Sequence, residues 1–185
     1  MHHIYSNLLE RKLDTKLHHV WIDEENNLAI FPLFNLNGQL VGYQQYNPNA
    51  DKLAKNNPKE GRYFTLLKDK KVGVWGLESW KLSNTLFITE GIFDACRITN
   101  LGYSAIALCS NDPSLQLKNW LYIIKQSRPV ISICDNDIAG NKMKKLGHEF
   151  HQITEYKDLG EATDKYVTKI INKFTYGGNE FKNTI

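Results

Sequence analysis

The first part of the chain contains short apolar runs separated by polar turns, which together predict a small α+β unit. In residues 1–20 the apolar side chains recur at spacings of three to five, which indicates a helix. The runs 28–34 and 39–46 flank a turn that contains Asn and Gly, the pattern of a β-hairpin. Two more short strands are expected at residues 61–67 and 72–76.

From residue 84 the pattern changes to an alternation of strands and helices. We expect strands at residues 86–89, 104–108, 129–134 and 152–156, and helices at 91–100, 115–125, 138–150 and 161–174. This order predicts an α/β fold with a parallel sheet and right-handed crossovers. The chain is therefore divided into an N-terminal α+β subdomain at 1–83, an α/β domain at 84–175 and a flexible C-terminal tail at 176–185.

Composition narrows the class of protein. The chain has 185 residues, of which 42% are hydrophobic and 23% charged, as in ordinary globular proteins. No apolar run approaches the roughly 18–20 residues of a membrane span, and the N-terminus lacks a signal pattern, so we expect a cytoplasmic protein with no membrane partner. The three cysteines, Cys96, Cys109 and Cys134, form no CxxC motif, so we expect buried free thiols and no zinc.

Acidic residues follow two of the predicted strands. Glu90 ends the first, and Asp135 and Asp137 end the third. The carboxyl ends of parallel strands are where open α/β sheets bind ligands. In an extended segment residues i and i+2 point the same way, so Asp135 and Asp137 would converge on one Mg²⁺ ion. An N-capping aspartate in an ordinary turn is the structural alternative, and it explains one of the two.

Two more acids have alternatives that stay open. Asp94 falls in the first turn of the predicted helix at 91–100, on the same side as Glu90, but an acid there also favours the helix dipole. Asp158 follows the last predicted strand and would reach the same sheet edge. With Glu161 three residues later, it equally fits a capping box.

The basic residues concentrate in one segment. Residues 51–71 hold seven bases and three acids, a net charge of +4 against +3 for the whole chain, and Tyr63, Phe64 and Trp75 lie among or near them. Bases with aromatic neighbours suit single-stranded nucleic acid, although a solvated lysine-rich loop has the same pattern. The candidate nucleic-acid and nucleotide contacts are Arg62, Lys68, Lys70, Lys71 and, on the predicted helix after the acids, Lys142.

Several of these segments resemble one family. Residues 87–95 (Phe-Ile-Thr-Glu-Gly-Ile-Phe-Asp-Ala) and 135–140 (Asp-Asn-Asp-Ile-Ala-Gly) resemble motifs of the Toprim domain, which bacterial and phage primases, topoisomerases and some nucleases share. Lys157-Asp158 with Glu161 is similar to the third motif of phage primase-helicases. Upstream, residues 30–43, 61–65 and 74–77 resemble the stretch that precedes Toprim in primases, so the resemblance covers roughly residues 28–167.

The resemblance implies a Toprim-like, Rossmann-like parallel-sheet domain preceded by a small primase-type α+β subdomain. It implies that Glu90 is the general acid/base, that Asp135 and Asp137 bind the catalytic Mg²⁺ or Mn²⁺, and that Asp94 and Asp158 support a second metal. Glu90, Asp135 and Asp137 would be the catalytic residues, and all five acids would contact metal. The implied activity is synthesis of RNA primers from NTPs on single-stranded DNA.

Some features depart from the family's pattern. The segment 108–114 replaces a Gly-rich loop, and Tyr46 stands where an arginine is expected. Neither a zinc-binding domain before the core nor a helicase domain after it is recognised, so we expect a separate zinc-binding or helicase protein as partner. Two alternatives stay open: a Toprim metal-dependent nuclease, and a non-catalytic nucleic-acid-binding accessory factor, of bacterial or phage origin.

Overall fold

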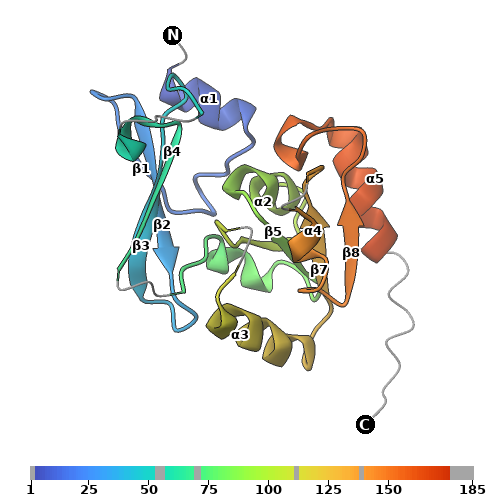
Figure 1. The fold of residues 1–185 in the computed structure, drawn as a ribbon. Coiled ribbons are helices and arrows are strands. Elements are labelled where there is room, and N and C mark those ends of the chain that lie inside the picture. Colours follow the sequence, from blue (N-terminus) through green and yellow to red (C-terminus); the bar gives the residue numbers. More distant parts are fainter. Residues whose placement is uncertain (1–2, 53–56, 69–71, 111–112, 138–139, 176–185) are drawn as a thin grey trace.

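A computed structural model describes residues 3–52, 57–68, 72–110, 113–137 and 140–175. It contains two four-stranded sheets (Figure 1). The first is antiparallel, in the order β1-β2-β3-β4, and the second is parallel, in the order β6-β5-β7-β8. The architecture is therefore mixed α/β, with the antiparallel unit first in the chain, as expected.

The antiparallel sheet contains the predicted hairpin. Its strands are β1 (Trp21–Asp23), β2 (Leu28–Phe34), β3 (Leu40–Tyr46) and β4 (Tyr63–Leu67). The side chain of Asn35 accepts hydrogen bonds from the backbone N–H groups of Asn37 and Gln39, and Gly38 takes the positive φ of 74° that closes the turn. Strand β1 was not predicted. The segment 72–76 forms isolated bridges to Phe34 and Ala107 instead of the expected strand.

The N-terminal helix is shorter than its pattern suggests. Helix α1 covers Ile4–Glu10, and Ile4 and Leu8 are its buried residues. The chain leaves the helix at Lys12, whose φ of 62° is left-handed, and this turn interrupts the apolar stripe. The prediction of a helix through residue 20 is therefore wrong, and Leu9, one of the apolar residues of this segment, is 71% exposed.

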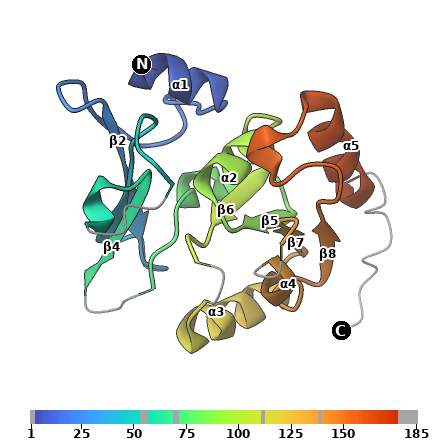
Figure 2. The same ribbon diagram turned by 45° about the horizontal axis from the view of Figure 1, so that its top comes forward.

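The parallel sheet matches its prediction more closely. Its strands are β5 (Leu86–Thr89), β6 (Ser104–Ala107), β7 (Val130–Cys134) and β8 (Glu149–Gln152), with helices α2 (Ile92–Thr99), α3 (Leu115–Lys125), α4 (Gly140–Met143) and α5 (Asp164–Thr175). Every residue of β5, β6 and β7 is buried. The reason is that α2 and α5 pack on one face of the sheet, and α3 and α4 pack on the other (Figure 2).

One helix prediction is wrong. The structure has only the short α4 in the segment 138–150, of which residues 138–139 lie outside the described part. Turns follow at residues 144–148, and β8 begins at Glu149, so the strand predicted at 152–156 is misplaced and shares only Gln152 with β8. The backbone N–H of Gly147 donates to the Ser132 side chain, and that of His148 donates to the carbonyl of Val130. Pairing with β7 therefore takes the chain out of the helix. The last predicted helix begins later, after a 3₁₀ turn at Leu159–Glu161.

The two sheets share one hydrophobic core. Phe31 of β2 makes edge-on contacts with Trp75 and with Phe93 of α2, at ring-centroid distances of 6.0 and 5.7 Å. Buried His18 adds two hydrogen bonds, with one ring nitrogen 2.9 Å from Glu78 and the other 3.0 Å from Thr99. These contacts fix the antiparallel unit against the edge of the parallel sheet. Trp75 is only 1% exposed, so its expected place among surface aromatics is wrong.

The division at residues 83 and 84 stays a prediction, and the tail at 176–185 lies outside the described residues. Within the described part of the chain, no helix has both the length and the apolar character needed to span a membrane. Cys96 and Cys134 are buried free thiols and Cys109 is a half-buried one, as the sequence indicated.

Candidate active site

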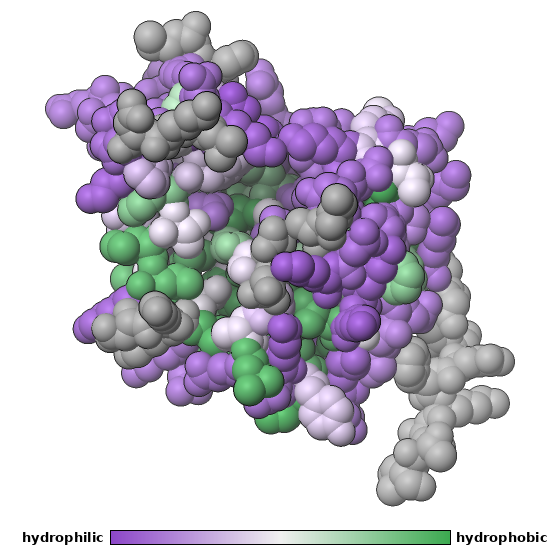
Figure 3. Space-filling model, viewed as in Figure 1, coloured by the Kyte–Doolittle hydropathy of each residue, from purple (hydrophilic) through white to green (hydrophobic). Residues whose placement is uncertain are grey.

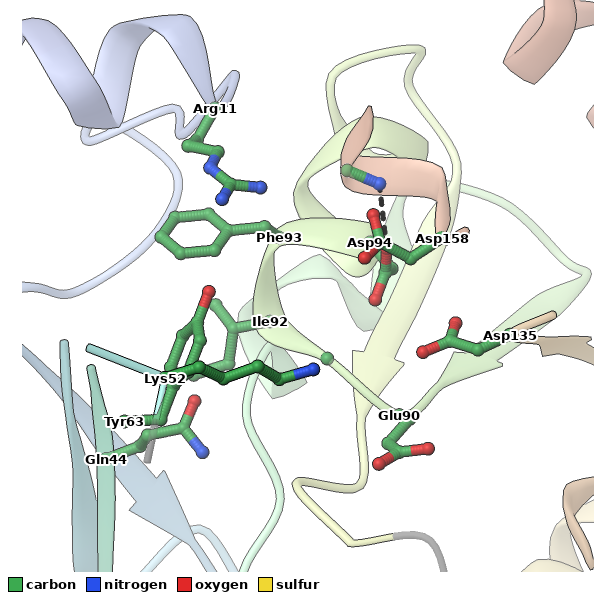
Figure 4. Close-up of a pocket in the computed structure, with 12 residues that line it drawn as sticks. Arg11, Gln44, Lys52, Tyr63, Glu90, Ile92, Phe93, Asp94, Asp135 and Asp158 are labelled. Carbon is green, nitrogen blue, oxygen red and sulfur yellow. Dashed lines mark hydrogen bonds between the residues drawn. The ribbon is translucent and has the colours of Figure 1, made fainter. Parts of the chain in front are cut away.

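Four of the predicted acids meet in one pocket (Figure 4). Glu90 comes from the end of β5, Asp94 from the first turn of α2, Asp135 from the end of β7, and Asp158 from the loop after β8. The pocket has a volume of about 270 Å³. The structure therefore brings these four acids together near the carboxyl edge of the parallel sheet.

Asp94 is the most deeply placed of the four, at 6% exposure. Its carboxylate accepts a hydrogen bond of 2.8 Å from the backbone N–H of Gly160 (Figure 4). Burial, and then the charge of Asp158, raise the pKa of Asp94 to about 7. The side chain therefore joins α2 to the loop after β8, in addition to its favourable position in the helix dipole.

The carboxyl group of Asp135 is affected by the charges of the three other acids in the pocket. Burial, followed by the charges of Asp94, Glu90 and Asp158, raises its pKa to about 8. The pKa of Glu90 is also raised, by burial and by the charge of Asp137. In addition, Oε2 of Glu90 is buried and has no hydrogen-bond partner among the described residues. A cluster in which carboxyl groups repel one another and one oxygen is unpartnered is electrostatically unsatisfied.

A divalent cation fits this cluster chemically, because Mg²⁺ and Mn²⁺ prefer carboxylate oxygens and would offset the repulsion. The geometry is not that of a finished metal site. Among the described residues, no three His, Cys, Asp or Glu side chains lie close enough together to hold a metal ion. The acids line one pocket but would have to draw together to share an ion.

Asp137 has a different position from Asp135. Its Oδ1 accepts a 2.7 Å hydrogen bond from the backbone N–H of Gly140, at the start of α4, and it does not line the pocket. Gly140 packs so closely on the Asp135 backbone that a Cβ there would clash. The structure thus brings only Asp135 of the pair into the pocket, whereas Asp137 caps α4 and acts on Glu90 through its charge.

Asp158 combines both alternatives that the sequence left open. It accepts a 3.0 Å hydrogen bond from the backbone N–H of Glu161, as an N-cap does, and it also lines the pocket. The loop that carries it is tied to the Asp135 loop, because the N–H of Asn136 donates to the carbonyl of Lys157. Capping therefore holds this carboxylate at the sheet edge.

The loop after β6 supports Glu90. The N–H of Cys109 donates a 3.0 Å hydrogen bond to the backbone carbonyl of Glu90, and Cys109 has the left-handed φ of 50° that usually favours glycine. Burial and the Glu90 charge raise the pKa of the Cys109 thiol to about 12, so it stays protonated. Through its backbone N–H, this cysteine therefore helps to fix the Glu90 backbone.

The opposite wall of the pocket comes from the antiparallel unit and the segment before it. Its polar residues are Arg11, Gln44, Lys52 and Tyr63 (Figure 4). The Arg11 guanidinium lies over the Phe93 ring, 5.0 Å from its centroid. Its charge opposes the rise in the pKa of Asp94, and the charge of Lys52 does the same for Glu90. The pocket thus has an acidic wall and a basic wall.

Sequence reasoning missed part of this basic wall. Lys52 was counted in the basic segment but not chosen, while Arg11 and Gln44 were not considered. Arg11 follows a short helix, far from the acids in the chain, and nothing in its neighbourhood distinguishes it. The hydrophobic periodicity of the sequence cannot show that the Arg11 side chain reaches the pocket.

The predicted nucleic-acid residues lie elsewhere. Arg62 is half-buried, and its Nε donates to the carbonyl of Ala50 at 3.1 Å, so it secures the loop before β4. Lys68 is exposed after β4 and does not line the pocket. Lys142 is exposed on α4 and lines a different hollow, beside α3. Lys70 and Lys71 lie outside the described residues.

The chain is similar to known proteins in part of its sequence and in its fold. No family model matches the chain. The DNA primase of Mycoplasma genitalium is 30% identical over 121 residues, which are 62% of this chain and 19% of that protein. The chain therefore spans about a fifth of this relative.

Among solved structures, the primase fragment of the bacteriophage T7 primase-helicase covers 79% of this chain at 15% identity, with a TM-score of 0.57. The DnaG primase catalytic domain bound to single-stranded DNA covers 94% at 14% identity, also with a TM-score of 0.57. The RNA polymerase domain of Mycobacterium tuberculosis DnaG covers 91% at 14% identity. The match takes in 62%, 58% and 62% of those chains, respectively. The chain therefore has the mixed α/β fold of primase catalytic cores.

Proposed function

We propose that this chain is a primase-like nucleotidyltransferase core of the Toprim type, which joins NTPs into RNA primers on single-stranded DNA with Mg²⁺ or Mn²⁺. The observation that carries the proposal is the pocket in which four carboxylates face Arg11 and Lys52. The relatives support the choice of substrate, because one is a DNA primase and one is a primase domain bound to single-stranded DNA.

The acidic wall takes the metal in this proposal. Asp135, Asp94 and Asp158 are the ligands favoured by their place in the pocket, with Glu90 beside them. Asp137 contributes its charge and serves as a ligand only if it leaves Gly140. A divalent cation bound there would neutralise the reacting phosphate and the pyrophosphate that leaves.

Glu90 is suited to accept the proton from the attacking 3′-hydroxyl. Its raised pKa brings its protonation nearer to neutral pH, where a general base is most effective. Its unpartnered Oε2 has room for one new hydrogen bond, and the Cys109 N–H holds its backbone in place. This is the role that the Toprim resemblance implies for the same residue.

The basic wall holds the triphosphate. Arg11 presents a planar, permanently charged group that binds phosphate through paired N–H donors, and the Phe93 ring beneath it fixes its orientation. Lys52 adds a second cation on the same side. The nucleotide would therefore lie between two charges of opposite sign, with its phosphates bridging from metal to cations.

Incorporation of a labelled NTP on a single-stranded DNA template tests the proposal, using the full chain, Mg²⁺ or Mn²⁺, and a separate primase zinc-binding protein. We expect oligoribonucleotides from the intact protein and none from Asp135→Ala. Absence of product from the intact protein under all these conditions contradicts it. Metal-dependent cleavage of DNA or RNA without NTPs supports the nuclease alternative. Binding that is unchanged in Glu90→Gln, without turnover in any assay, supports the accessory factor.

A further inference from the structure

A second charged surface lies over α3 and α4, on the face of the parallel sheet opposite to α2 and α5. Lys118 and Tyr122 of α3 line a hollow of about 370 Å³ together with Lys142 of α4 and Lys145 just after it. Lys125 and Leu146 complete the lining. These six residues are called the α3–α4 lysine surface. None of them lines the acidic pocket.

The charge of this surface has one sign. Residues 113–134 and 140–148 contain no Asp or Glu, while they contain all four of its lysines. Lys118, Lys142 and Lys145 are exposed, and Lys125 is half-buried with its Nζ 2.9 Å from the carbonyl of Gly147. Lys125 therefore helps to hold α3 to the loop before β8, and it lines the same hollow as the three exposed lysines. Such a surface attracts a polyanion.

The exposed ring of Tyr122 favours a single-stranded nucleic acid as the polyanion. It is 67% exposed, although its neighbour Leu121 is buried in the core at 1%. Lys118, Tyr122 and Lys125 are spaced four and three residues apart and so share one face of α3. An exposed aromatic ring between lysines offers base stacking as well as phosphate contacts, the combination used for single-stranded nucleic acids. An acidic peptide would use the lysines but would gain little from the ring.

The surface lies close in the chain to the acidic pocket. Helix α4 begins at Gly140, which packs directly on the backbone of Asp135. In Figure 2, α3 and α4 lie next to each other, as their shared hollow requires, and the face over α4 is mainly hydrophilic in Figure 3. A nucleic-acid strand that leaves the acidic pocket past the end of β7 would therefore reach α4 next.

We propose that the α3–α4 lysine surface binds single-stranded nucleic acid, with Lys118, Lys142 and Lys145 on successive phosphates and Tyr122 stacked on a base. The proposal rests on the proposed function only in assigning the strand to the template or product of the acidic pocket. Binding itself requires neither metal nor NTP.

Anisotropy of a labelled single-stranded DNA with the full chain in EDTA measures this binding without catalysis. The triple variant Lys118→Ala, Lys142→Ala, Lys145→Ala is compared with a control of equal charge, Lys16→Ala, Lys165→Ala, Lys169→Ala, whose lysines are exposed elsewhere. We expect a loss of affinity of at least about tenfold in the first and less than about twofold in the control. The slope of log affinity against log salt should fall by about 2, because each single-strand phosphate contact contributes about 0.7.

Tyr122→Leu and Tyr122→Trp separate stacking from charge. We expect Tyr122→Leu to weaken binding about fivefold or more and Tyr122→Trp to keep it, since stacking contributes about 1–3 kcal/mol per base. Equal affinities of the triple variant and its control would overturn the proposal. So would competition by polyglutamate as strong as that by DNA, with no effect of Tyr122→Leu, which would indicate an acidic protein partner. Failure of primer synthesis alone would leave these binding results unaffected and would concern only the acidic pocket.

Discussion

The acidic and basic walls of the pocket come from different parts of the molecule. The acids lie beyond strands of the parallel sheet or at the start of α2, whereas Arg11 follows α1 and Lys52 lies in the loop after β3. All four residues of β5 in the parallel sheet are buried, and the acids stand just beyond such strands. Strand β4 in the antiparallel sheet has no buried residue, and Tyr63 at its start lies on the basic wall with Arg11 and Lys52. A fully buried sheet can place charge only at its ends, whereas a half-exposed sheet carries polar groups along its length.

This difference predicts a division of labour. The acidic wall is electrostatically strained, since burial and mutual repulsion raise the pKa of Asp135 and Asp94. That strain suits a group that must bind a cation and promote chemistry. The basic wall is held by packing, through Phe31 and Phe93, and suits substrate binding. Changes on the acidic wall should therefore reduce kcat, and changes on the basic wall should raise KM.

The largest effect is expected from Asp135→Asn. We expect kcat for NTP incorporation to fall by about 10³-fold or more, with little change in KM, because the variant removes a central carboxylate of the proposed metal site. Steady-state kinetics with varied NTP measures both constants. Glu155→Gln, at an exposed position in the loop after β8, is the matched control and should retain full activity. A large rise in KM at unchanged kcat would contradict the assignment of the chemical step to the acidic wall and of substrate binding to the basic wall.

A smaller effect is expected on the basic wall. Arg11→Ala should raise the KM for NTP about 10- to 50-fold at nearly constant kcat, because a charge-assisted phosphate contact contributes about 1.5–3 kcal/mol. Arg11→Lys should recover only part of it, since lysine lacks the planar pair of donors. Lys16→Ala, an exposed cation nearby in sequence, should behave as the intact protein. A loss confined to kcat would instead assign Arg11 to the chemical step.

Asp137 sharpens the comparison within the acidic wall. Asp137→Ser keeps an oxygen that caps α4, whereas Asp137→Ala removes it and should lower the free energy of unfolding by about 1 kcal/mol. We expect Asp137→Ser to keep at least about a tenth of the activity, because Asp135 alone of the pair lines the pocket. Urea unfolding and the incorporation assay measure the two quantities. If Asp137→Ser is as inactive as Asp135→Asn, Asp137 is a ligand and the cap is only its resting contact.

The smallest effect is on stability. The pKa values of Asp135 and Asp94, about 8 and 7, lie above the unfolded value near 3.9, so between about pH 4 and 8 the folded state binds more protons. Without metal, stability should therefore fall as the pH rises from 5 to 8, and the unfolding temperature should fall with it. Added Mg²⁺ should restore it at pH 8 and have little effect at pH 5, where protons occupy the acids. A melting temperature that rises over this range would contradict the clustering.

Burial explains which elements the sequence could predict. Strand β5 and helix α3 begin and end where expected, because a buried run bounded by turns and a capped amphipathic helix are local signals. The prediction of a helix at residues 138–150 failed. Met143 and Leu146 have helical spacing, but hydrogen bonds of residues 147–148 to β7 decide the conformation. That pairing depends on a distant strand and leaves no local pattern.

The same distinction applies to the site. Glu90 and Asp135 were chosen because each directly follows a strand, and strand ends converge in a parallel sheet. Asp158 was chosen for the same reason, but β8 ends at Gln152, and the 3₁₀ turn that Asp158 caps carries it into the pocket instead. Arg11 was missed because only the packing between the two units brings it over Phe93. Lys142 was expected to contact the nucleotide or nucleic acid, and its hollow beside α3 gives it a separate place in the proposed nucleic-acid surface.

Binding of Mn²⁺ to the full chain, followed by electron paramagnetic resonance at pH 8, tests the central claim most directly. The account predicts that the intact protein and Arg11→Ala bind the ion alike, and that Asp135→Asn and Asp94→Asn each weaken binding by at least about tenfold, because the acids are the metal ligands. Equal Mn²⁺ affinity in the intact protein and both acid variants, or no binding to the intact protein even with NTP present, would contradict it.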